Sequence, residues 1–275
     1  MSPLVLGAVA YDPKVVTIWD GFKLFFEQHA FPFDYILYTS YERQVEAHLT
    51  GHVHVAWNSP LAWIEADRAA SKRGRRAQAV VMRDSDCDLT SLVVVRAESP
   101  YRTLQDLQGR RIGVGAADSP QATLIPLQHL AEQGVEGEVV RHDVLVGKHG
   151  DHIGGERDAI RALFRGDVDA ACILDGNHLG FVRDGTMAPG ATRILGQTAP
   201  YDHCNFTVLD DAPAGLVARF TELLLGMSYH DPTVRPLMDL EGLKAWRPGR
   251  TEGYAALARA VDRTGYLDAW LRSVA

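Results

Sequence analysis

The sequence predicts an α/β protein of two lobes, in which each lobe is a mixed sheet flanked by helices. Two observations lead to this fold class. Short apolar runs rich in β-branched residues alternate along the chain with segments of helical periodicity, as in sheets covered by helices. The chain has 275 residues, 46% of them hydrophobic, which is enough for one large domain or two modest ones.

The first lobe is expected to begin with three strand–helix pairs. We expect strands over 4–10, 33–38 and 53–57, and helices over 13–28, 40–49 and from 58 onward. In the first helix Trp19, Phe22 and Phe26 recur near helical spacing. Ser40 is suited to the N-cap of the second helix, and Pro60 to the first turn of the third.

The same alternation continues in the second lobe. We expect strands over 92–95, 111–115, 138–146 and 168–174, and helices over 103–107, 118–133 and 156–164. From Asp211 the chain is expected to be mostly helical, in short pieces ended by prolines.

This order suggests that the second lobe is inserted into the first. Lobe 1 would comprise 1–90 plus 205–275 and lobe 2 would comprise 98–195, with hinge crossings at 89–97 and 196–205.

Charge and composition favour a small-molecule partner. The formal net charge is −7, which gives no electrostatic support for binding nucleic acid or an anionic membrane. No apolar run approaches the roughly 20 residues that span a bilayer, and the three cysteines are expected to be reduced thiols. Met1-Ser2-Pro3 leads directly into the first strand without a basic segment or a cleavage site. We therefore expect a cytoplasmic protein, or a periplasmic or extracellular one if a leader peptide has been removed.

Three motifs follow one another in the order of a known family. Leu104-Gln105-Asp106-Leu107-Gln108-Gly109-Arg110 precedes the strand 111–115, and Arg165-Gly166-Asp167-Val168-Asp169-Ala170 follows a helix. Near the N-terminus, the segment 51–60 has a glycine, a short strand and a proline. Together they resemble the type 2 periplasmic-binding proteins, and most closely the phosphate, phosphite and phosphonate substrate-binding proteins of ABC transporters. The resemblance implies a small molecule held in a cleft between the lobes.

The resemblance also implies an oxyanion site where the helix at 118–123 begins, with Ser119, Gln121 and Thr123 as ligand-binding residues. The family uses the backbone N–H groups and small hydroxyls of such a helix start. We expect Asp118 to be the N-cap, where its carboxylate would occupy these amides and repel a second anion. This expectation argues against a phosphonate ligand.

A glycine-rich loop, Gly147 to Glu156, follows a predicted strand and is expected to face the cleft. His149, Asp151 and His152 would offer two imidazoles and a carboxylate to a divalent metal, the one cofactor that the sequence suggests. His149 and His152 are also candidate catalytic acid–base groups. Direct ligand contact by one of these histidines, or a loop whose polar residues stay solvated, are the alternatives.

Two further segments are expected to reach the cleft. Asp175 and His178 follow the strand 168–174 and are candidate ligand contacts, although a turn with a helix cap would explain Asp175 without function. His203 lies at the return crossing and is a candidate ligand contact and catalytic residue, and Asp86 is expected to approach that crossing. A Cys204 nucleophile activated by His203 is disfavoured, because neighbours on an extended chain point to opposite faces.

The first lobe contributes candidate ligand contacts from its strand-to-helix turns. Tyr11 and Trp57 are expected to stack on a planar ligand, and Asn58 and Ser59 to form hydrogen bonds with it. Tyr41 lies in a corresponding turn. Helix capping by Ser59 and rim packing by the aromatic residues are the structural alternatives.

Two main functions follow. The first is a binding protein for a small polar molecule, planar or carboxylate-bearing, which closes its lobes on the ligand; an ABC transporter permease would be its partner if a leader was removed. The second is a cytoplasmic lyase on the same fold, a decarboxylase or dehydratase that uses cleft histidines as acid–base groups or metal ligands. A ligand-sensing subunit without catalysis is a third.

Overall fold

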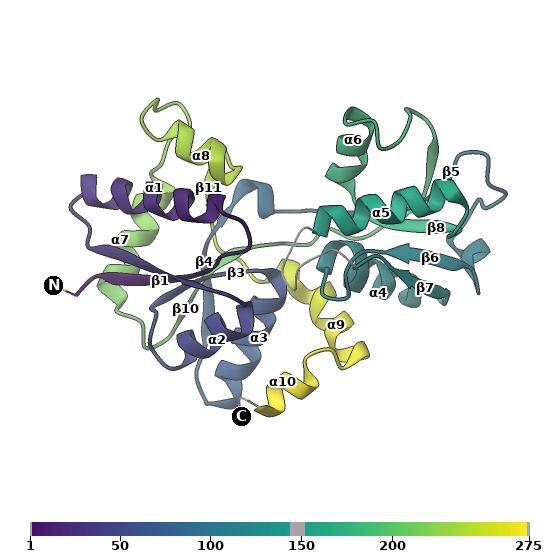
Figure 1. Ribbon diagram of the computed structural model, residues 1–275. Coiled ribbons are helices and arrows are strands. Elements are labelled where there is room, and N and C mark those ends of the chain that lie inside the picture. The colour runs from purple at the N-terminus through teal and green to yellow at the C-terminus, as the bar shows by residue number, and fades with distance from the viewer. Residues whose placement is uncertain (1, 144–151, 274–275) are drawn as a thin grey trace. The chain divides into compact units, whose positions relative to one another are not determined.

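The computed structural model describes residues 2–143 and 152–273, except the side chains of His152, Ile153 and Ser273. The chain divides into two compact units (Figure 1). Unit 1 comprises Met1–Cys87, Asp202–Tyr254 and Gly265–Ala275, and unit 2 comprises Asp88–Tyr201 and Ala255–Thr264. Each unit contains one mixed sheet with helices against it, which confirms the predicted fold class.

The unit 1 sheet has six strands in the order β11-β4-β10-β3-β1-β2. Its strands are β1 (Leu4–Val9), β2 (Phe33–Tyr38), β3 (Val55–Asn58), β4 (Ala77–Arg83), β10 (Asn205–Leu209) and β11 (Trp246–Pro248). β1 pairs in parallel with β2 and β3, whereas β10 pairs antiparallel with β3 and β4. The carboxyl ends of β1, β3 and β4 therefore share one edge with the amino end of β10.

Helices cover both faces of this sheet. Figure 1 shows α1 and α7 on one face and α2 and α3 on the other. The unit 1 helices are α1 (Lys14–Gln28), α2 (Tyr41–Leu49), α3 (Pro60–Lys72), α7 (Ala214–Leu225), α8 (Arg235–Glu241) and α10 (Asp268–Ser273), with short turns η1 (Asp84–Asp86) and η4 (Glu252–Tyr254). α1 forms as expected, because its apolar positions are spaced so that they fall on one buried stripe. That stripe packs on Phe206 and Trp246 from the sheet.

The unit 2 sheet has five strands in the order β7-β6-β8-β5-β9. They are β5 (Ser91–Arg96), β6 (Arg111–Val114), β7 (Glu138–Arg141), β8 (Ala170–Leu174) and β9 (Thr192–Gln197). β6 pairs in parallel with β7 and β8, and β5 pairs antiparallel with β8 and β9. The strands β5 and β9 thus include most of the predicted crossing 89–97 and the beginning of the crossing 196–205.

The unit 2 helices also lie on both faces of their sheet. They are η2 (Leu104–Leu107), η3 (Pro120–Leu124), α4 (Ile125–Glu132), α5 (His152–Arg165), α6 (Asp175–Arg183) and α9 (Ala255–Thr264). α9 was expected in the first lobe but belongs to unit 2, where it packs against α4. Its Arg259 and Arg263 donate hydrogen bonds to Glu132 and Gln128 of that helix. None of the helices in the described ranges is both long and apolar enough to cross a membrane.

Candidate functional site

One partly buried arginine is held between two buried carboxylates at the carboxyl edge of the unit 1 sheet. Arg83, the last residue of β4, donates from Nε to Asp86 Oδ2 at 2.5 Å and from Nη2 to Asp86 Oδ1 at 2.9 Å. Its Nη1 donates to Oε1 of Glu241 at 3.1 Å and to the Glu241 carbonyl at 2.9 Å. The guanidinium also lies 5.1 Å from the ring centroid of Trp57. Two carboxylates therefore face one cation.

The two carboxyl groups that share Arg83 differ in pKa. Burial alone would raise the pKa of Asp86, but Arg83 and His203 outweigh it and lower this pKa to about 2. Burial raises the pKa of Glu241 to about 7, although Arg83 acts against it. Asp86 is thus a fixed anion, whereas Glu241 is close to half-ionised at neutral pH.

His203 and Cys204, which directly precede β10, complete this group of side chains. His203 Nδ1 lies 3.5 Å from Asp86 Oδ1 and 3.1 Å from Cys204 Sγ. The His203 backbone N–H also donates to the Asp86 carbonyl at 2.8 Å, which confirms the expected approach of Asp86 to this segment. We call Arg83, Asp86, His203, Cys204 and Glu241 the Arg83 cluster.

The expectation that His203 and Cys204 point to opposite faces is wrong. Both residues lie before the first residue of β10, so the alternation of a strand does not apply to them. The imidazole instead turns toward the thiol and Asp86. Burial, with a smaller contribution from Asp86, raises the pKa of the Cys204 thiol well above its usual value. The thiol therefore stays protonated, which disfavours a nucleophilic role.

Two phenols lie beside the Arg83 cluster. Tyr11 follows β1 and is 48% exposed, and burial of its hydroxyl, together with Glu241 and Cys204, raises its pKa to about 12. Tyr41 is half-buried at the first residue of α2, and its pKa is raised by burial and by the nearby Cys204 and Tyr11. Both phenols are therefore neutral hydrogen-bonding groups. Like the ring of Trp57, they are first-lobe candidates that lie next to the cluster.

The other three first-lobe candidates lie inside unit 1. Trp57 is 7% exposed, and its ring packs against Phe206 with centroids 4.6 Å apart. Asn58 is fully buried and hydrogen-bonded within the sheet, and Ser59 Oγ caps α3 by accepting from the Ala62 N–H. The capping role of Ser59 is its structural alternative. β3 is a central strand, so its last residues are covered on both faces.

A buried chain of hydrogen bonds links β3 to His203. Gln44 Nε2 donates to Asn58 Oδ1 at 2.7 Å, and Asn58 Nδ2 donates to Thr207 Oγ1 at 2.8 Å. The chain continues from Thr207 to Asn205, from Asn205 to the Tyr254 hydroxyl, and from that hydroxyl to the His203 carbonyl, each link being 2.7 or 2.8 Å long. Because these polar groups are buried and paired, they fix the backbone that carries His203.

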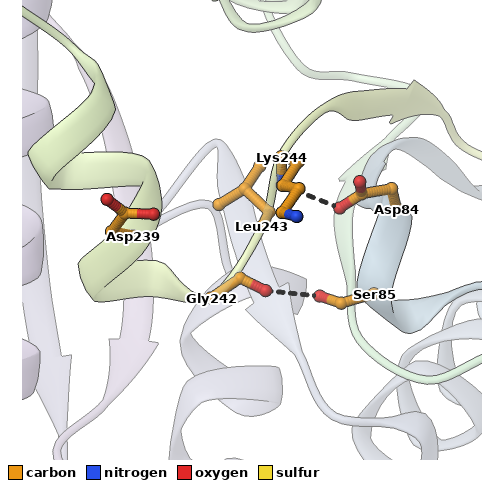
Figure 2. Close-up of a pocket in the computed structure, with 6 residues that line it drawn as sticks. All are labelled: Asp84, Ser85, Asp239, Gly242, Leu243 and Lys244. Atoms are coloured by element: carbon orange, nitrogen blue, oxygen red, sulfur yellow. Dashed lines mark hydrogen bonds between the residues drawn. The ribbon is translucent and has the colours of Figure 1, made fainter. Parts of the chain in front are cut away.

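A cavity of about 390 Å³ lies beside the turns that carry Asp86 and Glu241, and Figure 2 shows the residues that line it. Its lining consists of Asp84, Ser85, Asp239, Gly242, Leu243 and Lys244. Across it, the Lys244 N–H donates to Asp84 Oδ1 at 3.1 Å and Ser85 Oγ to the Gly242 carbonyl at 2.8 Å. These bonds tie the η1 turn to the end of α8 and so hold Asp86 and Glu241 on either side of Arg83. No residue predicted from the sequence lines this cavity.

The predicted oxyanion site in unit 2 is arranged differently from the expectation. Ser119, not Asp118, is the N-cap of η3, because its Oγ accepts the Ala122 N–H at 3.2 Å. The argument against a phosphonate that rested on an Asp118 cap therefore fails. Thr123 Oγ1 donates to the Ala116 carbonyl at 2.7 Å, so its proton is already engaged. Gln121 is buried, and its Oε1 has no hydrogen-bond partner among the described residues.

The remaining predicted residues are dispersed. In unit 2, Asp175 Oδ2 accepts from Thr90 Oγ1 at 2.7 Å, and His178 Nε2 lies 2.9 Å from Thr192 Oγ1. Burial lowers the pKa of His178. The predicted metal site at His149, Asp151 and His152, with the catalytic roles given to its histidines, lies outside the described side chains.

Sequence reasoning missed Arg83 and Glu241. A signal existed for Arg83, because an arginine that ends a strand just before an acidic turn is placed at the same sheet edge as Tyr11. Glu241 gave no signal, since it ends a short helix more than a hundred residues away in sequence.

Comparison with known proteins agrees with this architecture. PhnD1 from Prochlorococcus marinus in complex with methylphosphonate has a TM-score of 0.68 and 15% identity, covering 96% of this chain and 98% of that one. XAC2383 from Xanthomonas citri bound to chloride has a TM-score of 0.71 and 18% identity, covering 96% and 100%. The aliphatic sulphonate binding protein SsuA from Escherichia coli has a TM-score of 0.58 and 15% identity, covering 98% and 94%. At these identities the structures establish the fold alone.

The family is established by a match that spans most of the chain. A family model described as "ABC transporter, phosphonate, periplasmic substrate-binding protein" matches residues 11–254. The match extends from the Tyr11 turn to η4 and contains every member of the Arg83 cluster. This chain therefore belongs to the phosphonate family of ABC transporter substrate-binding proteins, which bind small molecules.

Proposed function

We propose that this chain is the solute receptor of an ABC importer and that its solute is a small molecule bearing a phosphonate or sulfonate group. Support comes from the family match over residues 11–254. Relatives of the same fold include a protein bound to methylphosphonate and one described as binding aliphatic sulphonates.

The observation that carries the proposal is the pair of neutral phenols at the carboxyl edge of the unit 1 sheet. Ligands of open α/β sheets bind outside the carboxyl ends of the strands. Tyr11 and Tyr41 lie there, and their raised pKa values keep both hydroxyls protonated. A protonated hydroxyl can donate to an oxyanion oxygen.

Isothermal titration calorimetry tests this proposal with methylphosphonate, ethanesulfonate and inorganic phosphate as separate probes. Tyr11→Phe and Tyr41→Phe should each weaken binding of the preferred probe about 3- to 10-fold, as expected for loss of one hydrogen bond. Tyr35→Phe is the matched control, because its hydroxyl donates to Asp20 at 2.7 Å on the unit 1 surface. Absence of binding by all three probes, or an equal loss in the control, would refute the proposal.

A lyase remains a second candidate because of one specific contact. His203 Nδ1 lies 3.5 Å from Asp86 Oδ1, so a carboxylate orients an imidazole next to the two phenols, which suits acid–base chemistry. NMR of each probe during prolonged incubation with the protein distinguishes the two candidates. An intact probe supports a receptor, whereas turnover that His203→Gln abolishes supports the enzyme.

Location and partner separate the same two candidates. A receptor would act outside the cytoplasmic membrane and dock on a permease, whereas the lyase would be cytoplasmic. Fractionation of native host cells, followed by crosslinking and mass spectrometry of the captured partner, should find the receptor in the outer fraction joined to a membrane-spanning permease. Recovery only from the cytoplasm, without such a partner, would favour the lyase.

A further inference from the structure

We propose that Asp86, His203 and Cys204 form a binding site in unit 1 for one divalent transition-metal ion of the Zn²⁺ class. Its ligands are other residues than the predicted set His149, Asp151 and His152, and the proposal does not depend on which solute the protein binds.

The three donor atoms already surround the volume of one ion. A carboxylate oxygen, an imidazole nitrogen and a thiol sulfur lie within 4.8 Å of one another. Zinc–ligand distances of about 2.0–2.3 Å place pairs of tetrahedral ligands roughly 3.3–3.8 Å apart. The distances of 3.5 Å from His203 Nδ1 to Asp86 Oδ1 and 3.1 Å to Cys204 Sγ are close to this range. Small side-chain adjustments would therefore bring all three atoms onto one ion.

The surrounding contacts hold these ligands in place. The guanidinium of Arg83 grips both oxygens of Asp86, as an outer partner of a ligating carboxylate does. The His203 backbone is fixed on both sides, by its N–H to the Asp86 carbonyl and by its carbonyl to the Tyr254 hydroxyl. The Asp86 side chain is 3% exposed, whereas that of His203 is 24% exposed. The site is thus rigid, with an approach for the ion on the His203 side.

Charge balance favours a divalent ion. Without an ion, the buried carboxylates of Asp86 and Glu241 outnumber the single guanidinium of Arg83. Coordination removes the proton from the Cys204 thiol and passes it to solvent, which adds a further negative charge. With Glu241 ionised, the two positive charges of the ion would compensate both, and the occupied cluster would be neutral overall.

The ligand set indicates which ions fit. Thiolate and imidazole suit zinc and cobalt, whereas magnesium and calcium prefer all-oxygen sites. Three protein ligands leave a fourth tetrahedral position open, which a water molecule or a ligand group would occupy.

Titration of metal-free protein with Co²⁺ tests the assignment. Solute binding is measured separately by calorimetry on EDTA-treated protein. We expect one equivalent of Co²⁺ to bind with a near-ultraviolet thiolate charge-transfer band and intense tetrahedral d–d bands, all removed by Zn²⁺. Cys204→Ser should abolish the charge-transfer band, and His203→Ala should weaken binding at least 10-fold. Cys87→Ser is the matched control, because Cys87 lies beside Asp86 in sequence but outside the donor group, and it should leave the band intact.

Several results would overturn the proposal. They are the absence of the charge-transfer band, its loss in Cys87→Ser but not in Cys204→Ser, or the loss of Co²⁺ binding on joint replacement of His149 and His152 by Ala. The last result would move the site to that loop.

A measurement on the wild-type chain tests the site even if the variants do not fold. Zn²⁺ should protect Cys204 from alkylation at least 10-fold more than Cys87, as mapped by mass spectrometry, and equal protection would count against the site. Because no solute is present in these experiments, failure to bind a metal does not contradict the receptor proposal. Likewise, solute binding in the presence of EDTA does not contradict the metal proposal.

Discussion

A buried carboxyl group on α3 should make unit 1 measurably more stable when it is replaced by an amide. Glu65 is 6% exposed, and its Oε2 has no hydrogen-bond partner among the described residues. Burial, with a small contribution from Glu42, raises its pKa from 4.5 to about 8. At pH 7 the folded chain therefore keeps this group protonated, whereas the unfolded chain ionises it.

The size of the effect follows from that difference. For a carboxyl with a raised folded-state pKa, the unfolded state binds fewer protons between the two pKa values, so stability is lost as pH rises through that window. At pH 7, which lies 2.5 units above the ordinary pKa of 4.5, keeping Glu65 protonated costs the folded state about 3 kcal/mol of unfolding free energy. Glu65→Gln removes this loss. The difference in unfolding free energy between the variant and wild type should therefore be about 3 kcal/mol more favourable at pH 7 than at pH 4. Any change in packing around the amide is the same at both pH values and cancels from this comparison.

Urea unfolding followed by tryptophan fluorescence is the appropriate assay, because all five tryptophans belong to unit 1. They are Trp19, Trp57, Trp63, Trp246 and Trp270. Glu27→Gln on the exposed side of α1 is the control and should change the unfolding free energy by less than about 0.5 kcal/mol at either pH. If the gain of Glu65→Gln were the same at pH 4 and pH 7, the assigned ionisation would be wrong.

Three further changes in unit 1 have expected outcomes that the same assay measures. Burial lowers the pKa of His48 from 6.5 to about 4, so the unfolding free energy should fall by about 2 kcal/mol between pH 7 and pH 5. His48→Leu should remove this pH dependence, and a variant with the pH profile of wild type would contradict the prediction. Phe206→Ala should cost about 3–5 kcal/mol, because the ring is 1% exposed and packs against four other aromatic rings; a cost below about 1 kcal/mol would show that the core collapses around it. Arg83→Met should cost about 3–5 kcal/mol, since it leaves Asp86 and Glu241 buried without their cation; a stabilised variant would show that the ion group is dispensable for folding.

Much of the fold follows from local patterns in the sequence. α1 and β2 have nearly the bounds that periodicity predicts, because their apolar stripes are complete within the segment itself. β11 was not anticipated in a region expected to be mostly helical, because a three-residue strand has too little pattern of its own and forms by pairing with β4. The placement of α9 in unit 2 depends on its contacts with α4, more than a hundred residues earlier in the chain.

The candidate site was predictable where topology alone decides it. Tyr11 and Tyr41 follow strands whose carboxyl ends share one edge, so a strand pattern suffices to place them. Trp57 and Asn58 were expected in a similar turn, but they are the last residues of β3, and pairing with β10 places both inside the sheet. That pairing joins residues far apart in sequence, and no local pattern reports it.

The division of the chain into interleaved segments has a consequence for how the protein is made on the ribosome. The second segment of unit 1 begins at Asp202, so β10 and β11 are synthesised only after all five strands of unit 2. The strand order places β10 between β3 and β4, so the early strands of unit 1 cannot close their sheet while unit 2 is emerging. Until then, the exposed edges of β3 and β4 are free to pair wrongly. The nascent chain is therefore expected to need a chaperone longest at its N-terminal part, although that part is made first.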